Sequence, residues 1–205
     1  MRRTMIKAED RAKALAKVKK LAGIATQLRR GRDFPITRLT MLKSLCQDPV
    51  AAARFGLYLT KLTRAKAKKR YRPLVDRAVA EATRYLSKPT GRPPERLREL
   101  LGELFHSQNE VEHHRWADVR IIHCREALLA EYMLSCITQP WASAYWGYRL
   151  AAFYAERYDS RYGTGLIPAS AAAVEDIVRF WTRYLRTQGA VQGSGRARPK
   201  RSPRS

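Results

Sequence analysis

The sequence predicts an all-α fold, with six to eight helices packed into one compact domain and a disordered basic C-terminal tail. Three observations support this prediction. Apolar residues recur at helical spacing, turn signals separate these stretches at short intervals, and no convincing strand run or internal repeat is present in the 205 residues. The hydrophobic fraction of 45% is enough to build a core, which excludes a globally disordered chain.

Each helix is expected from its apolar spacing and from the residues at its ends. In the first helix, Leu15, Val18 and Leu21 gather on one side. Asp48-Pro49 is a strong start signal, because a capping residue precedes a proline at the first helical position. The expected helices cover residues 5–29, 36–47, 49–69, 72–88, 94–107, 110 or 116 to 137, 140–158 and 170–186.

The positive charge is concentrated in two parts of the chain. The formal net charge is +23, and residues 1–72 hold 21 Lys and Arg against four acidic residues. Residues 73–187 hold 15 against 14, and residues 188–205 hold five basic and no acidic residues. We therefore expect a basic helical segment facing nucleic acid at 1–72, a near-neutral aromatic-rich helical core at 73–187 and a disordered basic tail at 188–205.

Two predicted helices each carry a row of basic side chains opposite an apolar face. Lys13, Lys17 and Lys20 form the first row. The second consists of basic residues 54, 61, 64 and 68, spaced by seven, three and four. Such rows favour the binding of nucleic acid, because each phosphate contact releases condensed counterions. The residues expected to contact nucleic acid are Lys13, Lys17, Lys20, Arg29, Arg30, Arg32, Arg54, Lys61, Arg64, Lys68, Lys69, Arg70 and Arg72.

Aromatic residues gather in the C-terminal half, where 13 of 19 lie between Trp116 and Tyr184. They include the group Trp141, Tyr145, Trp146 and Tyr148. Their helical spacing and the scarcity of adjacent cations favour core packing over a base-stacking platform. The exception is residues 149–162, where arginines and tyrosines alternate and a stacking role stays open.

All four histidines fall between residues 106 and 123, together with several glutamates. Glu103-x-x-His106 and Glu110-x-x-His113 each place both side chains on one helical face, as in di-iron bundles. A di-iron site takes such pairs from two helices, whereas these two pairs follow one another along the chain. We therefore expect a polar helix surface, with His106, Glu110, His113 and His123 as the candidates for a metal site.

Other motifs are weak or absent. No Gly-rich phosphate loop is present, and the helix-turn-helix pattern over residues 36–62 lacks the usual turn with glycine. The odd set of cysteines, Cys46, Cys124 and Cys136, indicates core thiols in a reducing compartment. No apolar run reaches the ~18–20 residues of a membrane span. Acidic residues at positions 9 and 10 weigh against a mitochondrial transit peptide.

These features favour a non-enzymatic nucleic-acid-binding protein that acts through phosphate contacts of two basic helix faces. RNA is slightly favoured over DNA, in a nucleoprotein complex with other protein subunits. One alternative is a helical metalloprotein or metal-dependent enzyme that uses residues 103–126, and another is an adaptor for an acidic protein. We expect no cofactor, no membrane partner and a cytoplasmic location, with the nucleus and the mitochondrion left open for a eukaryotic source.

Overall fold

The structure is a computed structural model that describes residues 8–109, 124–156 and 169–193. The predicted all-α fold is confirmed, since the described residues form helices joined by turns and contain no strand beyond one isolated bridge between Glu156 and Ala169. The α-helices are α1 (Ala8–Arg29), α2 (Pro49–Thr63), α3 (Arg72–Ser87), α4 (Glu95–Asn109), α5 (Arg125–Thr138), α6 (Ser143–Ala155) and α7 (Ala171–Gly193). The 3-10 helices are η1 (Ile36–Ser44), η2 (Arg64–Lys66) and η4 (Pro140–Ala142).

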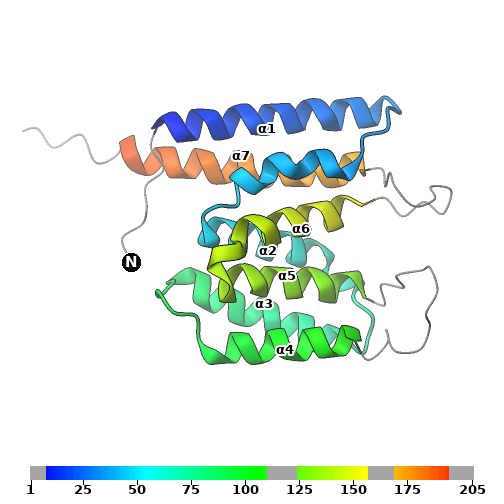
Figure 1. The fold of residues 1–205 in the computed structure, drawn as a ribbon, viewed down its shortest axis with the longest axis vertical. Helices are drawn as coiled ribbons and strands as arrows, with labels where there is room; N and C mark the ends of the chain where they lie inside the picture. Colours follow the sequence, from blue (N-terminus) through cyan, green and yellow to red (C-terminus); the bar gives the residue numbers. More distant parts are fainter. Residues whose placement is uncertain (1–7, 110–123, 157–168, 194–205) are drawn as a thin grey trace, which may run out of the picture.

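The helices are stacked around α5, which contacts α2, α6, α3 and α4. In Figure 1, α3 and α4 lie at one end of the molecule, and α1 and α7 form an antiparallel pair at the other. Between these ends, α2 and α6 pack against α5, and η1 packs against α6. The first and last described helices are therefore neighbours in space.

The core draws on residues from both sides of the boundary expected at residues 72 and 73. Ten consecutive residues of α5, from Leu129 to Thr138, are buried. Phe55 of α2 is fully buried, with ring centroids 5.2 Å from Phe180 and 5.4 Å from Trp181 of α7. The basic N-terminal segment thus supplies core residues as well as surface.

The expected helix starts at two prolines are confirmed. Asp48 precedes α2 and its carboxylate accepts a hydrogen bond from the Val50 amide at 2.9 Å, with Pro49 in the first turn. Helix α3 begins at Arg72 with Pro73 in its first turn. Proline suits this position because its missing N–H would have no partner within the helix.

The segment expected to be helical over residues 36–47 forms the 3-10 helix η1 instead. Its apolar residues repeat every three positions, at Ile36, Leu39, Leu42 and Leu45. A 3-10 helix has three residues per turn, so this spacing brings all four side chains to one side. Leu39 and Leu42 are fully buried there.

The helix expected over residues 49–69 is shorter than predicted. Helix α2 ends at Thr63 rather than near residue 69, and η2 follows. The backbone becomes extended at Ala67, whose side chain is buried. The guanidinium of Arg72 donates to the carbonyl oxygens of Ala65 and Ala67, at 3.0 and 3.3 Å. These bonds satisfy carbonyls that a continuing helix would have paired.

The long helix expected from residue 110 or 116 to 137 is not continuous. Cys124 is extended, with φ −151° and ψ 103°, and α5 begins at Arg125. The Arg125 guanidinium donates to the carbonyl oxygens of Phe153 and, at 2.5 Å, of Tyr154, which fixes the start of α5 to the end of α6. Residues 110–123 lie outside the described residues.

The last helix is longer than expected. Helix α7 runs to Gly193, so the first residues of the expected tail, 188–193, are helical. The remaining tail residues, 194–205, lie outside the described part of the chain.

Candidate nucleic-acid interface

The three lysines of the first basic row have different surroundings. Lys13 and Lys20 of α1 are exposed, and Lys13 forms an ion pair with Glu9 at 2.6 Å. Lys17 is partly buried, and its Nζ donates to Oγ of Ser44 in η1 at 2.6 Å. Lys17 therefore lies on the flank of α1 that faces η1, not on the side opposite the apolar face.

The arginines at the end of α1 also differ from one another. The guanidinium of Arg29 binds the carboxylate of Glu175 in α7, with Nη2 at 2.7 Å from Oε2. This bond lowers the pKa of Glu175 and raises that of Arg29. Arg30 and Arg32 are exposed in the turn formed at Gly31, where φ is +77°. Both remain available to an anion.

The densest group of exposed cations lies where α2 ends and α3 begins. We call it the basic corner; it consists of Lys61, Arg64, Lys66, Lys68, Lys69, Arg70 and Arg72. No acidic residue occurs between Asp48 and Asp76 in the sequence. Within the described part of the chain, none of the seven forms an ion pair with a carboxylate. Six of the seven were predicted from the sequence; Lys66 was missed.

The fold holds the basic corner together through its two arginines next to α3. Arg72 bonds to the carbonyls of η2, so the start of α3 folds back against the end of α2. The Arg70 guanidinium lies 4.5 Å from the centre of the Tyr71 ring and donates to its hydroxyl at 2.7 Å. That hydroxyl donates to the carbonyl of Ser107 in α4 at 3.3 Å. The carbonyl end of α2 also favours cations nearby.

Arg54 is separate from this group, although its spacing predicted one stripe with residues 61, 64 and 68. It is partly buried, and its Nη2 donates to the carbonyl of Leu86 at 3.2 Å. Leu86 lies in the last turn of α3, where main-chain carbonyls lack helical partners. The Arg54 side chain therefore joins α2 to α3.

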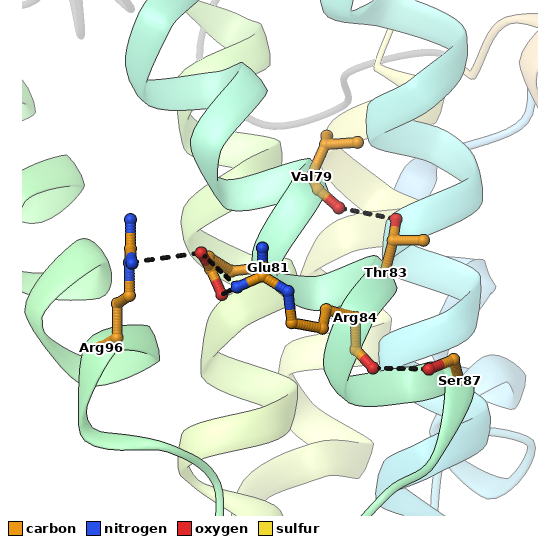
Figure 2. Close-up of polar contacts among 6 residues, drawn as sticks. All are labelled: Val79, Glu81, Thr83, Arg84, Ser87 and Arg96. Atoms are coloured by element: carbon orange, nitrogen blue, oxygen red, sulfur yellow. Dashed lines mark hydrogen bonds and ion pairs between the residues drawn. The ribbon is translucent and has the colours of Figure 1, made fainter.

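On α3 beyond the basic corner, and on α4, the arginines are matched by acids. In Figure 2, Glu81 of α3 receives Arg84 from its own helix and Arg96 from α4, at 2.8 and 3.2 Å. The side chain of Glu81 is only 12% exposed, so the pairing is sheltered. The same close-up shows Thr83 and Ser87 bonded to carbonyls of their own helix. The contrast distinguishes the basic corner from an ordinary charged helix surface.

A further row of exposed arginines lies on α7 and was missed by the sequence analysis. Arg179, Arg183 and Arg186 occupy one side of the helix, spaced by four and three residues. Arg179 pairs with Asp176 at 3.1 Å and also lowers the pKa of Glu175, next to Arg29. The spacing was visible in the sequence, but the near-zero net charge of residues 73–187 concealed it.

The candidate metal residues fall mostly outside the described residues. Glu110, His113 and His123 lie there, while His106 is exposed on α4. Glu103 forms an ion pair with Arg77 at 2.6 Å. Among the residues that the structure describes, no three His, Cys, Asp or Glu side chains gather as metal ligands would.

None of the helices in the described ranges is both long and apolar enough to cross a lipid bilayer. Comparisons of the chain with models of protein families, with curated proteins and with solved structures find no match.

Proposed function

We propose that this protein binds nucleic acid without catalysing a reaction, and that the basic corner supplies the main phosphate contacts. The observation that carries the proposal is the density of exposed cations, seven within residues 61–72, without an acidic neighbour in sequence or an ion pair to a described carboxylate. Like charges held this close repel one another, and a polyanion relieves that repulsion. Lys13, Lys20, Arg30 and Arg32 extend the positive surface on α1 and the turn after it.

RNA is the first partner to test, and DNA the second. Phosphate contacts position a protein without reading base sequence. The chain carries no clear groove-reading motif, so recognition would depend on the partner's shape and on further protein subunits. The proposal includes a cytoplasmic location, which fits three buried cysteines that are free thiols.

Salt dependence of binding is the direct test. The purified chain is titrated against a fluorescent RNA or DNA oligonucleotide, and anisotropy is followed at several salt concentrations. With ~6–10 phosphate contacts, affinity should fall by roughly 10³–10⁵-fold between 50 and 200 mM salt. Absence of binding at low salt, or an affinity that does not change with salt, would exclude the proposal.

A matched pair of charge reversals locates the interface. The variant Lys61→Glu/Lys66→Glu changes two exposed lysines of the basic corner that form no side-chain bond to another described residue. The control Lys88→Glu/Arg92→Glu changes the net charge equally, at the turn between α3 and α4. The first variant should weaken binding and flatten the salt dependence by nearly one unit of slope per lost contact. Equal losses in the two variants would show that only net charge matters.

The same assay distinguishes nucleic-acid binding from the alternative that the protein is an adaptor for an acidic protein. A polyglutamate chain carries negative charge without phosphates, so it serves as a competitor. A phosphate-binding surface should release the oligonucleotide far more readily to unlabelled RNA than to polyglutamate. The reverse order would favour an acidic protein as the natural partner.

A further inference from the structure

Two aromatic side chains near the start of α6 are exposed although core packing was expected for them. Trp141 in η4 is 82% exposed, and Tyr145 in the first turn of α6 is 48% exposed. Trp146 and Tyr148, from the same sequence group, are partly buried as expected. Burial would stabilise an indole, and Trp141 lacks that stabilisation, so we consider it a candidate contact for a partner.

Trp141, Tyr145 and Arg149 follow one another along η4 and α6, and we call this series the row. Tyr145 and Arg149 share one side of α6 because they are four positions apart, and Trp141 precedes them in η4. Arg149 is held in place, since its Nη2 donates to the hydroxyl of Tyr132 at 3.0 Å. Its guanidinium also lies 5.6 Å from the centre of the Tyr132 ring. The side of α6 that carries Tyr145 and Arg149 thus presents an exposed aromatic ring next to a fixed cation, and Trp141 of η4 adds a second exposed ring.

The neighbouring Trp146 supports the ring of Tyr145. The ring of Tyr145 meets that of Trp146 edge to face, with centroids 5.0 Å apart. The Trp146 Nε1 donates to Oε1 of Gln139 at 2.9 Å. Tyr145 is therefore backed by a ring that is itself anchored, which limits the entropy lost when a ligand stacks on it.

A cation from η1 lies next to the aromatic side chains of α6. Lys43 of η1 places Nζ 5.2 Å from the centre of the Tyr148 ring. The next residue, Ser44, accepts the hydrogen bond from Lys17 of α1. η1 therefore joins α6 to α1, which carries the further exposed cations Lys13 and Lys20.

We propose that Trp141 and Tyr145 stack on unpaired bases of a single-stranded nucleic acid whose phosphates follow Lys43 and the lysines of α1. Aromatic faces interleaved with cations are the usual means of holding single strands, because every base offers a flat face for stacking. A second copy of this chain is a poor occupant, since each copy carries a net charge of +23. The proposal rests on the proposed function and names its substrate class.

The test compares three probes of equal length: a single-stranded oligouridylate, an abasic strand with the same phosphates, and a duplex. The full chain should bind the oligouridylate more tightly than the abasic strand. Trp141→Ala and Tyr145→Ala should each weaken binding of the oligouridylate by about 5- to 150-fold, the range that the loss of one stacked base gives. Both variants should bind the abasic strand and the duplex as the parent does.

Two further variants keep the result interpretable. Trp141→Phe retains a flat ring and should restore most of the affinity for oligouridylate. Phe105→Ala removes another exposed aromatic, 51% exposed on α4, and should change none of the three affinities. Circular dichroism of each variant shows whether the helices are intact.

The outcomes separate the two proposals. If Trp141→Ala and Tyr145→Ala bind oligouridylate like the parent, the stacking role is wrong while phosphate binding stands. If the parent binds none of the three probes at low salt, the proposed function itself fails. If the variants instead lose binding to vesicles of anionic lipid and keep that to oligouridylate, the row is a membrane contact and the stacking proposal is overturned.

Discussion

Gly147 of α6 packs directly against Cys46, which follows η1 and is fully buried. A Cβ atom at position 147 would lie 2.5 Å from the Cβ of Cys46, closer than two non-bonded carbon atoms can approach. Contact at this point brings α6 and η1 together and so places Lys43 beside Tyr148. The absence of a side chain at Gly147 is therefore a condition of this packing.

Gly147→Ala should destabilise the fold by about 1–3 kcal/mol, because the added methyl forces either α6 or η1 to move. The matched control is Gly23→Ala in the interior of α1, where an added Cβ meets nothing within 4 Å. The control should stabilise the helix by up to ~1 kcal/mol, since alanine is the better helix former. Urea denaturation measures both, and equal effects would contradict the packing described.

Glu131 of α5 makes stability depend on pH in the direction opposite to that of a salt-bridged carboxylate. It is 8% exposed, and burial raises its pKa from 4.5 to about 7. The folded state therefore favours the protonated carboxyl. The contribution of this group to the stability of the fold is complete below pH 4.5 and is lost as pH rises through 7. The loss amounts to about 3 kcal/mol for a pKa shift of this size.

Glu131→Gln should remove that dependence, because an amide does not titrate. The free energy of unfolding from urea at pH 5 and pH 8 is compared for parent and variant. The variant should gain stability relative to the parent at pH 8 and much less at pH 5. A difference that is the same at both pH values would show that Glu131 is not the titrating group.

Arg54 should affect stability, unlike Lys61 of the basic corner. Arg54→Ala removes the hydrogen bond to the Leu86 carbonyl and leaves that carbonyl at the end of α3 unpaired. A cost of about 1–2 kcal/mol is expected. Lys61→Ala, on the exposed side of the same helix, should change stability by less than about 0.5 kcal/mol. Urea denaturation gives the stability of both, and reversal of this order would refute the assignment.

The three cysteines should be inert toward alkylation while the protein is folded. Cys46 and Cys136 are fully buried and Cys124 is 2% exposed. Burial raises the pKa of each thiol, which suppresses the reactive thiolate. Iodoacetamide at pH 8 should label them only as fast as the chain unfolds, and label all three in urea. Rapid labelling of the native protein, followed by mass spectrometry, would identify a thiol that is accessible.

The sequence predicted those features that depend on local chemistry. Asp48 with Pro49 specifies the start of α2 through a side-chain bond and a fixed φ, and both are visible in the sequence. The all-α fold follows likewise from apolar spacing. The role of the seven cations of the basic corner as phosphate contacts stays a prediction.

Features that depend on distant partners could not be predicted. Lys17 and Arg54 have the spacing of solvent-facing cations, yet their acceptors lie 27 and 32 residues further along the chain. Trp141 shows the reverse case, since its helical spacing suggested burial. It lies in η4, before α6 begins, so the apolar pattern of that helix does not determine its exposure.

The pairing of α1 with α7 also determines when the native structure can be completed. The main neighbour of α1 is α7, and 146 residues separate Arg29 from its partner Glu175. At a synthesis rate of about 5–20 residues per second, the ribosome needs roughly 7–30 s to cover this distance. Helix α1 therefore lacks its main neighbour on the nascent chain during that time, and closure of the helix pair is among the last steps of folding.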